Sequence, residues 1–235
     1  MDAASFTPPG AASFVPPGAG LAALRRSAAG CTGCELAGPA TRTVFSTGPA
    51  TGRIAFVGEQ PGDVEDTRGL PFVGPAGQLL DRALAEVGVP RDQAYITNAV
   101  KHFRFRQDAP GTRRIHQTPD ALHIDACKPW LLAELAVVDP EVLVLLGATA
   151  GRALLGPTFR VTRDRGRLLP RAGRATEPAA VQGGWLLATL HPSAILRADD
   201  REQAYAGFVA DLRLAAAVLH AAPVGAVGPV GPVGG

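Results

Sequence analysis

The sequence lacks a hydrophobic run long enough to cross a membrane. No stretch approaches the ~18 consecutive apolar residues that a spanning helix requires. The first residues also do not show the basic-then-apolar order of a secretory signal. We therefore expect a cytoplasmic protein with no membrane partner.

The chain also lacks a strong net charge, because its formal net charge is only +2. This balance does not favour nucleic-acid binding over the whole surface, so an anion site must be a local patch. One such patch lies between residues 101 and 116, where several basic residues accompany a single acid. The basic residues are Lys101, Arg104, Arg106, Arg113 and Arg114, and the acid is Asp108. The segment is either an anion-binding loop or a solvated loop with surplus arginines.

Cysteine is scarce, with 3 residues in the whole chain. An odd number that includes Cys31-Thr32-Gly33-Cys34 favours metal or redox chemistry over a structural disulfide in a reducing compartment. With Cys127, the thiolates leave a four-ligand site one donor short. His102 and His123 are both candidates for the fourth ligand. The spacing does not separate zinc from an iron–sulfur cluster.

Four short apolar runs alternate with segments of helical periodicity. The runs have the composition of buried strands, whereas the segments between them repeat apolar residues every three or four positions, as at Leu79, Leu80 and Ala83. The predicted strands are 53–57, 94–98, 142–146 and 185–190, and the predicted helices are 76–87, 119–137, 148–155 and 201–219. This alternation predicts an α/β fold, with a central four-stranded, mostly parallel sheet flanked by helices on both faces.

The two ends of the chain differ in composition from the rest. Residues 1–18 are rich in proline, glycine and alanine, and residues 221–235 repeat a Pro-Val-Gly pattern. Segments of this kind bury too little apolar surface to become ordered. We predict a disordered lead, a single domain over residues 19–220 and a flexible tail.

Polar motifs follow three of the predicted strands. Glu59 comes directly after the first strand, Asn98 ends the second, and His191-Pro192-Ser193 follows the fourth. Open α/β sheets place their ligands at the carboxyl ends of their strands. A carboxylate, an amide and an imidazole would meet there as a base, a reader of base edges and an oxyanion donor, and Ser193 would bind phosphate. The alternative is that these residues only form turns and caps.

Two further segments carry chemistry. The loop from Gly111 to Pro119 places His116 beside two arginines, which suits a polyanion brought close to a nucleophile or general acid/base. Phe72 lies between Pro71 and Gly74. Its ring would either offer a flat face to a planar ligand or belong to the core.

Together these motifs resemble the uracil-DNA glycosylase superfamily, in particular its iron–sulfur branch and, within that branch, the UdgX type. The resemblance extends from about residue 31 to residue 219. The matching segments are Glu59-Gln60-Pro61-Gly62, Leu70-Pro71-Phe72-Val73-Gly74-Pro75-Ala76-Gly77, Thr97-Asn98-Ala99-Val100-Lys101-His102 and His191-Pro192-Ser193. The loop Arg113-Arg114-Ile115-His116 is the mark of the UdgX type.

The resemblance implies a [4Fe–4S] cluster. Its ligands would be Cys31, Cys34, Cys127 and His102. Related enzymes have a cysteine at the position of His102, which is why the resemblance favours this histidine over His123.

The resemblance also implies a role for each residue of the other motifs. Phe72 would stack on an extruded uracil, Asn98 would hydrogen-bond its edge, and the Gln60 region would hold the base from its other side. Glu59 and His191 would line the bond that breaks.

The activity that the resemblance implies is excision of uracil from DNA. The nucleophile His116 would then join the protein to C1′ of the abasic site in a single turnover, with free uracil as the product. Arg113 and Arg114 would contact the DNA, and single strands would be the easier substrate for a monomeric protein. Thr112 stands where the family usually has lysine, which removes one phosphate contact.

Two other interpretations stay open. The first is a conventional glycosylase that hydrolyses its substrate and turns over many times. The second is a nucleic-acid-binding module without catalysis, in which the metal site is purely structural.

Overall fold

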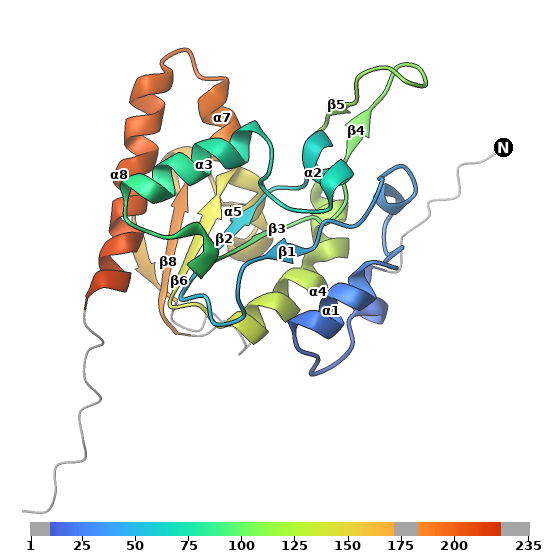
Figure 1. The fold of residues 1–235 in the computed structure, drawn as a ribbon, viewed down its shortest axis with the longest axis horizontal. Coiled ribbons are helices and arrows are strands. Elements are labelled where there is room, and N and C mark those ends of the chain that lie inside the picture. Colours follow the sequence, from blue (N-terminus) through green and yellow to red (C-terminus); the bar gives the residue numbers. More distant parts are fainter. Residues whose placement is uncertain (1–9, 172–182, 222–235) are drawn as a thin grey trace, which may run out of the picture.

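The computed structural model describes residues 10–171 and 183–221 (Figure 1). Residues 1–9 of the predicted lead and residues 222–235 of the predicted tail lie outside the described residues. Residues 10–18 do not fit the predicted disordered lead. Ala11–Phe14 form a 3-10 helix, η1, and Ala11 is buried, so the ordered chain begins earlier than composition indicated.

The core of the fold is a six-stranded sheet with the order β1-β3-β2-β6-β8-β7. The four predicted strands form its centre and are parallel to one another, which confirms the predicted fold class. They are β2 (Ile54–Gly58), β3 (Ala94–Asn98), β6 (Val142–Leu146) and β8 (Trp185–Thr189). Every residue of β2, β3 and β6 is buried, as is usual for strands covered on both faces.

The sheet has six strands, whereas the sequence predicted four, because the prediction missed the strand at each edge. The edge strands β1 (Ser46–Thr47) and β7 (Leu168–Pro170) pair antiparallel with β3 and β8. They are only two and three residues long, so neither shows the periodicity on which sequence reasoning depends.

Two groups of helices cover the two faces of the sheet (Figure 1). One face packs against α1 (Leu21–Ala28), α4 (Ala121–Val138) and α5 (Gly147–Leu155). The other face packs against α3 (Pro75–Glu86), α7 (Pro192–Leu196) and α8 (Arg201–His220). Alternate strand residues enter the two cores: Ala55 and Val57 face the first group, whereas Ile54 and Phe56 face the second.

Helix α4 begins later than the sequence indicated. The carboxylate of Asp120 accepts the N–H of His123 and caps the helix, so Pro119 precedes it. The remaining elements are short and were not predicted. They are η2 (Glu35–Ala37), α2 (Asp63–Arg68), η3 (Arg91–Gln93), α6 (Val161–Asp164) and the hairpin strands β4 (Phe105–Arg106) and β5 (Ile115–His116).

Among the described residues, no helix is both long and apolar enough to cross a membrane.

Candidate active site

The predicted site residues meet at the carboxyl ends of the parallel strands. Glu59 directly follows β2, Asn98 is the last residue of β3, and His191 lies just beyond β8 as the N-cap of α7. The three side chains come together because parallel strands bring their carboxyl ends to one edge of the sheet.

Glu59 links the sheet to His116. Its Oε1 lies 3.3 Å from His116 Nε2, and its Oε2 accepts a hydrogen bond from Thr149 Oγ1 at 2.5 Å. Thr149 is in the first turn of α5 and is buried. The threonine orients the carboxylate, so its other oxygen faces the imidazole. His116 keeps 47% of its side chain exposed, which leaves the ring open to a substrate.

His116 is carried by a two-stranded hairpin, in which it pairs with Phe105 of β4. Gln60 holds the base of this hairpin. Its Nε2 donates to the carbonyl oxygens of Arg104 (3.1 Å) and Gln117 (3.0 Å), and its Oε1 accepts the N–H of Arg104. The Gln60 side chain thus supports the hairpin, and contact between the Gln60 region and uracil stays a prediction. That amide is engaged with backbone on both strands of the hairpin.

Arg114 also anchors the hairpin. Its Nε lies 2.5 Å from Asp63 Oδ1 and its Nη1 lies 2.6 Å from Asp66 Oδ2, both on α2. The guanidinium further stacks over Phe103 and Phe105, with 5.3 and 5.0 Å to the ring centroids. Contact of Arg114 with DNA stays a prediction, beside this role in the fold.

The basic patch predicted from the sequence is largely neutralised by ion pairs, most of them with acids outside the segment. Lys101 pairs with Glu134, Arg104 with Asp120, and Arg106 with Asp108. Arg113 is exposed and has no acidic partner among the described residues. It is the one arginine of the loop whose charge the fold leaves unpaired.

His191 is held as a neutral hydrogen-bond donor. Its Nδ1 accepts the N–H of Ser193 at 3.2 Å and lies 2.9 Å from Ser193 Oγ, so the ring proton is assigned to Nε2. Burial, followed by the charges of His116 and Arg197, lowers the pKa of His191 to about 4. Ser193 fixes this tautomer, and its binding of phosphate stays a prediction.

Two buried polar atoms of the site have no partner among the described residues. They are His191 Nε2 and Asn98 Oδ1. Buried polar atoms are normally satisfied, so an unpaired donor and an unpaired acceptor at one edge indicate a polar ligand.

The ring of Phe72 lies beside these atoms. Its centroid is 5.8 Å from that of His191. Gly58 makes room for this arrangement, because a Cβ there would lie 2.4 Å from Asn98 Oδ1 and 2.5 Å from Phe72 Cζ. The site therefore combines a flat aromatic face with a donor and an acceptor.

The three cysteines are all buried in one core cluster. Burial raises the pKa of Cys127 to about 12, and the charges of Cys34 and Cys31 add to the effect. Burial likewise raises the pKa of Cys34. Cys127 Sγ accepts the N–H of Lys101 at 3.2 Å, and Cys31 Sγ accepts Trp130 Nε1–H at 3.3 Å. Thiols in this setting become thiolates only with a compensating cation, and N–H donors at sulfur suit a metal-bound thiolate.

The two candidate histidines differ in their surroundings. His123 has both ring nitrogens engaged, because Nε2 lies 2.7 Å from Glu35 Oε1 and Nδ1 lies 2.6 Å from Asp120 Oδ1. His102 is buried, with Nε2 2.9 Å from Thr43 Oγ1, and burial lowers its pKa to about 4. A neutral imidazole and three thiols fit an iron–sulfur cluster by donor chemistry. No three His, Cys, Asp or Glu side chains in the described chain stand together in metal-binding geometry.

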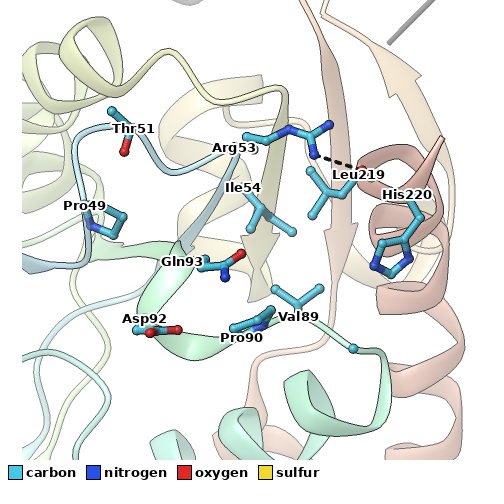
Figure 2. A pocket seen from close by; sticks show the side chains of 11 residues that line it. Pro49, Thr51, Arg53, Ile54, Val89, Pro90, Asp92, Gln93, Leu219 and His220 are labelled. Carbon is cyan, nitrogen blue, oxygen red and sulfur yellow. Dashed lines mark hydrogen bonds between the residues drawn. The ribbon is translucent and has the colours of Figure 1, made fainter. Parts of the chain in front are cut away.

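The opposite edge of the sheet holds a cavity of about 260 Å³ (Figure 2). It lies at the amino ends of β2 and β3, where Ile54 and Val89 face Leu219 and His220 of α8. Arg53 closes one side by donating to the carbonyl oxygen of Leu219 at 2.9 Å. None of the predicted site residues lines this cavity.

Sequence reasoning missed several residues that build the site. Thr149 orients Glu59, and Asp63 and Asp66 hold Arg114. An acidic pair three residues apart at the start of a helix is an available signal, since both carboxylates lie on one face. Thr149 gives no local signal, because only the neighbouring strand brings it to Glu59.

The fold and the site define an α/β protein with an aromatic face and unpaired hydrogen-bonding atoms beside a carboxylate–imidazole pair, at the carboxyl ends of its parallel strands. Residues 45–213 match the family model of the uracil DNA glycosylase superfamily. The chain belongs to that superfamily.

Several relatives are similar over most of the domain. The chain is 38% identical over 168 residues to a type-4 uracil-DNA glycosylase of Thermotoga maritima, an alignment that covers 71% of this chain and 78% of that protein. The type-4 uracil-DNA glycosylase of Pyrobaculum aerophilum is 37% identical over 61% of this chain and 68% of its own length. That of Archaeoglobus fulgidus is 32% identical over 71% of this chain and 78% of its own length.

Proposed function

We propose that this protein excises uracil from DNA and then becomes covalently joined, through His116, to C1′ of the abasic site. The observation that carries the proposal is the 3.3 Å contact between Glu59 Oε1 and His116 Nε2, beside the unpaired atoms of Asn98 and His191. The names of the relatives support the first step. The exposed imidazole beside a carboxylate supports the second.

Base excision follows from the chemistry of the site. As the glycosidic bond breaks, uracil becomes an anion and the sugar gains positive charge. Nε2–H of His191 donates to the developing uracil oxyanion. Because the His191 ring is neutral, it does not attract a carboxylate or other anion that would occupy this donor first. Glu59 supplies negative charge near the sugar. Asn98 binds the base edge and Phe72 stacks on its face.

The covalent step uses the same carboxylate. A ring nitrogen of His116 donates its lone pair to C1′ as the C1′–N1 bond to uracil breaks, so one bond forms and one is lost. The bonding electrons leave with uracil, and the imidazole proton passes to Glu59. Glu59, the described carboxylate beside the resulting imidazole–sugar bond, then carries the proton and does not activate water to reverse it, so each protein molecule reacts once.

The DNA reaches this site with its base out of the stack. Single strands and mispaired duplexes require the least energy for that step, and we propose single-stranded uracil-containing DNA as the preferred substrate of a monomeric protein. Arg113, which is exposed and lies three residues before His116, would bind a phosphate beside the reacting nucleotide. Gln60 and Arg114 support the hairpin that carries His116 and would act on the DNA through its position.

The cysteines serve structure in this proposal. Cys31, Cys34, Cys127 and His102 would hold a [4Fe–4S] cluster, which links the amino-terminal segment to α4 and to the loop after β3. Base excision transfers no electrons, so we assign the cluster no step in the reaction. Protein purified without oxygen should contain iron and acid-labile sulfide in equal amounts, and Cys34→Ala should lose both. Zinc in place of iron would contradict this assignment.

Mass spectrometry of the protein mixed with a short single-stranded uracil oligonucleotide tests the proposed function. We expect a species with the mass of protein plus DNA minus uracil, and released uracil that never exceeds the protein. The matched thymine oligonucleotide should give neither product. Uracil in molar excess over protein, without an adduct, would instead establish hydrolytic turnover. Equal binding of both strands without release would establish a binding module.

The pH dependence of adduct formation follows from the state of His116. Burial, opposed by Glu59 and reinforced by Arg197, holds the pKa of His116 below its ordinary value of about 6.5. The ring is therefore neutral and nucleophilic above that pH, and it loses its lone pair only as the pH falls through the lowered pKa. We expect the rate to fall at acid pH and to reach half of its maximum at a pH below 6.5. A half-maximal rate at or above pH 6.5 would contradict a lowered pKa.

A further inference from the structure

Phe72 has an unusual backbone conformation for an aromatic residue. Its φ is +55°, and among the described residues only Asp139 shares a positive φ without being glycine. Asp139 is the ordinary left-handed cap at the end of α4. Phe72 has no such helix end to explain it. A bulky side chain persists in this region only where its surroundings hold it there.

The carboxylate of Glu65 holds the residues that follow Phe72. Glu65 lies on α2 and is buried. Its Oε1 accepts the N–H groups of Val73 (3.1 Å) and Gly74 (2.8 Å), and its Oε2 accepts the N–H of Gly62 at 3.1 Å. One side chain therefore ties the Phe72 loop to the segment that follows Glu59.

The guanidinium of Arg91 holds the other side of the same loop. Its Nη2 donates to the carbonyl oxygen of Phe72 at 3.1 Å and to that of Pro71 at 3.4 Å. Its Nη1 pairs with Asp81 on α3, which fixes the direction of the planar group. The Glu65 carboxylate thus accepts hydrogen bonds from N–H groups of the loop, and the Arg91 guanidinium donates to its carbonyl groups.

Close packing leaves the loop and the ring no other position. A Cβ at Gly77 would lie 1.9 Å from the carbonyl oxygen of Phe72, and a Cβ at Gly58 would lie 2.5 Å from its ring. Helix α3 approaches the backbone of Phe72 from one side, and β2 approaches its ring from the other. The hydrogen bonds select the conformation, and the packing removes the alternatives.

We propose that Glu65 and Arg91 are positioning residues, which hold Phe72 in its strained conformation so that the ring faces the base-binding site. Glu65 has a second effect, because it also fixes the loop of Glu59 relative to that ring. This inference rests on the proposed excision of uracil, but not on the covalent step. Loss of Arg91 should weaken base binding alone. Loss of Glu65 should weaken base binding and slow bond cleavage.

Single-turnover release of uracil, measured over a range of protein concentrations in excess of DNA, separates the two effects. A base–aromatic stack contributes a factor of roughly 5 to 150 in binding, and we expect Arg91→Met to raise the half-saturating concentration by about tenfold. Its maximal rate should stay within about twofold of the wild type. Glu65→Gln should raise the same concentration and also lower the maximal rate, because the Gln amide meets the N–H of Gly62 donor to donor.

A double-mutant cycle distinguishes positioning from general stability. In a Phe72→Leu background, Arg91→Met should change the half-saturating concentration by less than about twofold. Equal factors in both backgrounds would overturn the inference. Arg53→Met is the matched control, because Arg53 also pairs with a carboxylate and donates to a backbone carbonyl, but at the far edge of the sheet. It should leave both parameters unchanged.

Amide hydrogen exchange gives a readout that needs no activity. In Glu65→Gln, the N–H groups near Gly62 should exchange faster than in the wild type, while those of β2 and β6 keep their protection. Unchanged exchange at Gly62, Val73 and Gly74 would overturn the role of Glu65 even if the variant were inactive. A wild-type protein that releases no uracil would instead overturn the proposed function.

Discussion

Replacing His116 with alanine should abolish the covalent adduct and leave uracil excision in place. The imidazole is the exposed nucleophile beside Glu59, whereas the Thr149 hydroxyl that also contacts this carboxylate is buried. Without the ring, water enters the vacated space and can attack C1′ with Glu59 as the base. The variant should therefore release uracil in excess over protein, with the adduct below detection by mass spectrometry.

The fold should tolerate the His116 substitution, because nearly half of the side chain is exposed. We expect its free energy of unfolding to change by less than about 1 kcal/mol. His220→Ala is the control, since His220 is an exposed histidine at the opposite edge of the sheet. It should retain full adduct formation. An adduct that survives in His116→Ala would show that another group is the nucleophile. Loss of folding or of iron would show that His116 is structural.

Replacing Lys101 with methionine should destabilise the protein more than any exposed substitution. Lys101 and Glu134 form an ion pair whose side chains are 1% and 0% exposed. Lys101 Nζ also donates to Thr97 Oγ1 at 2.6 Å and to the carbonyl oxygen of Asn98 at 2.9 Å. Burial already raises the pKa of Glu134, an effect that Lys101 opposes. Without the lysine the carboxylate is buried alone, which costs about 3–5 kcal/mol.

Urea denaturation measures the loss in the free energy of unfolding, and two further variants serve as comparisons. Arg53→Met breaks an exposed pair with Glu141 and should cost less than about 1 kcal/mol. The double variant Lys101→Met with Glu134→Leu removes both charges and should recover a large part of the loss. Full recovery is not expected, because Tyr95 Oη donates to Glu134 Oε1 at 2.8 Å and would lose its partner. A single variant as stable as the wild type would show that the pair is not buried.

The central strands were predictable because their information is local. A short, uninterrupted run of apolar β-branched and leucine residues such as Val142–Leu146 is typical of a strand buried on both faces. The parallel arrangement then follows from the helices between the strands, and it brings Glu59, Asn98 and His191 to one edge. The short edge strands lacked any periodic signal and were not predictable.

The roles of polar residues were less predictable than their positions. The sequence placed Gln60 and Arg114 at the site, but the fold turned both toward the hairpin that carries His116. A side chain that makes several hydrogen bonds can serve a ligand or the backbone, and only its neighbours decide. Those neighbours, Arg104 and Gln117 for one and Asp63 and Asp66 for the other, are far from it in sequence.

The sequence by itself determined the four central strands, the edge at which the chemistry lies and the residue types gathered there, because apolar periodicity and strand ends are local properties. Only the tertiary structure decided which charges remain free. Counting within residues 101–116 predicted a basic patch, but acids at positions 63, 66, 120 and 134 pair with most of it and leave Arg113 exposed. The energy of an ion pair depends on the distance between its charges in space, and separation along the sequence does not give that distance.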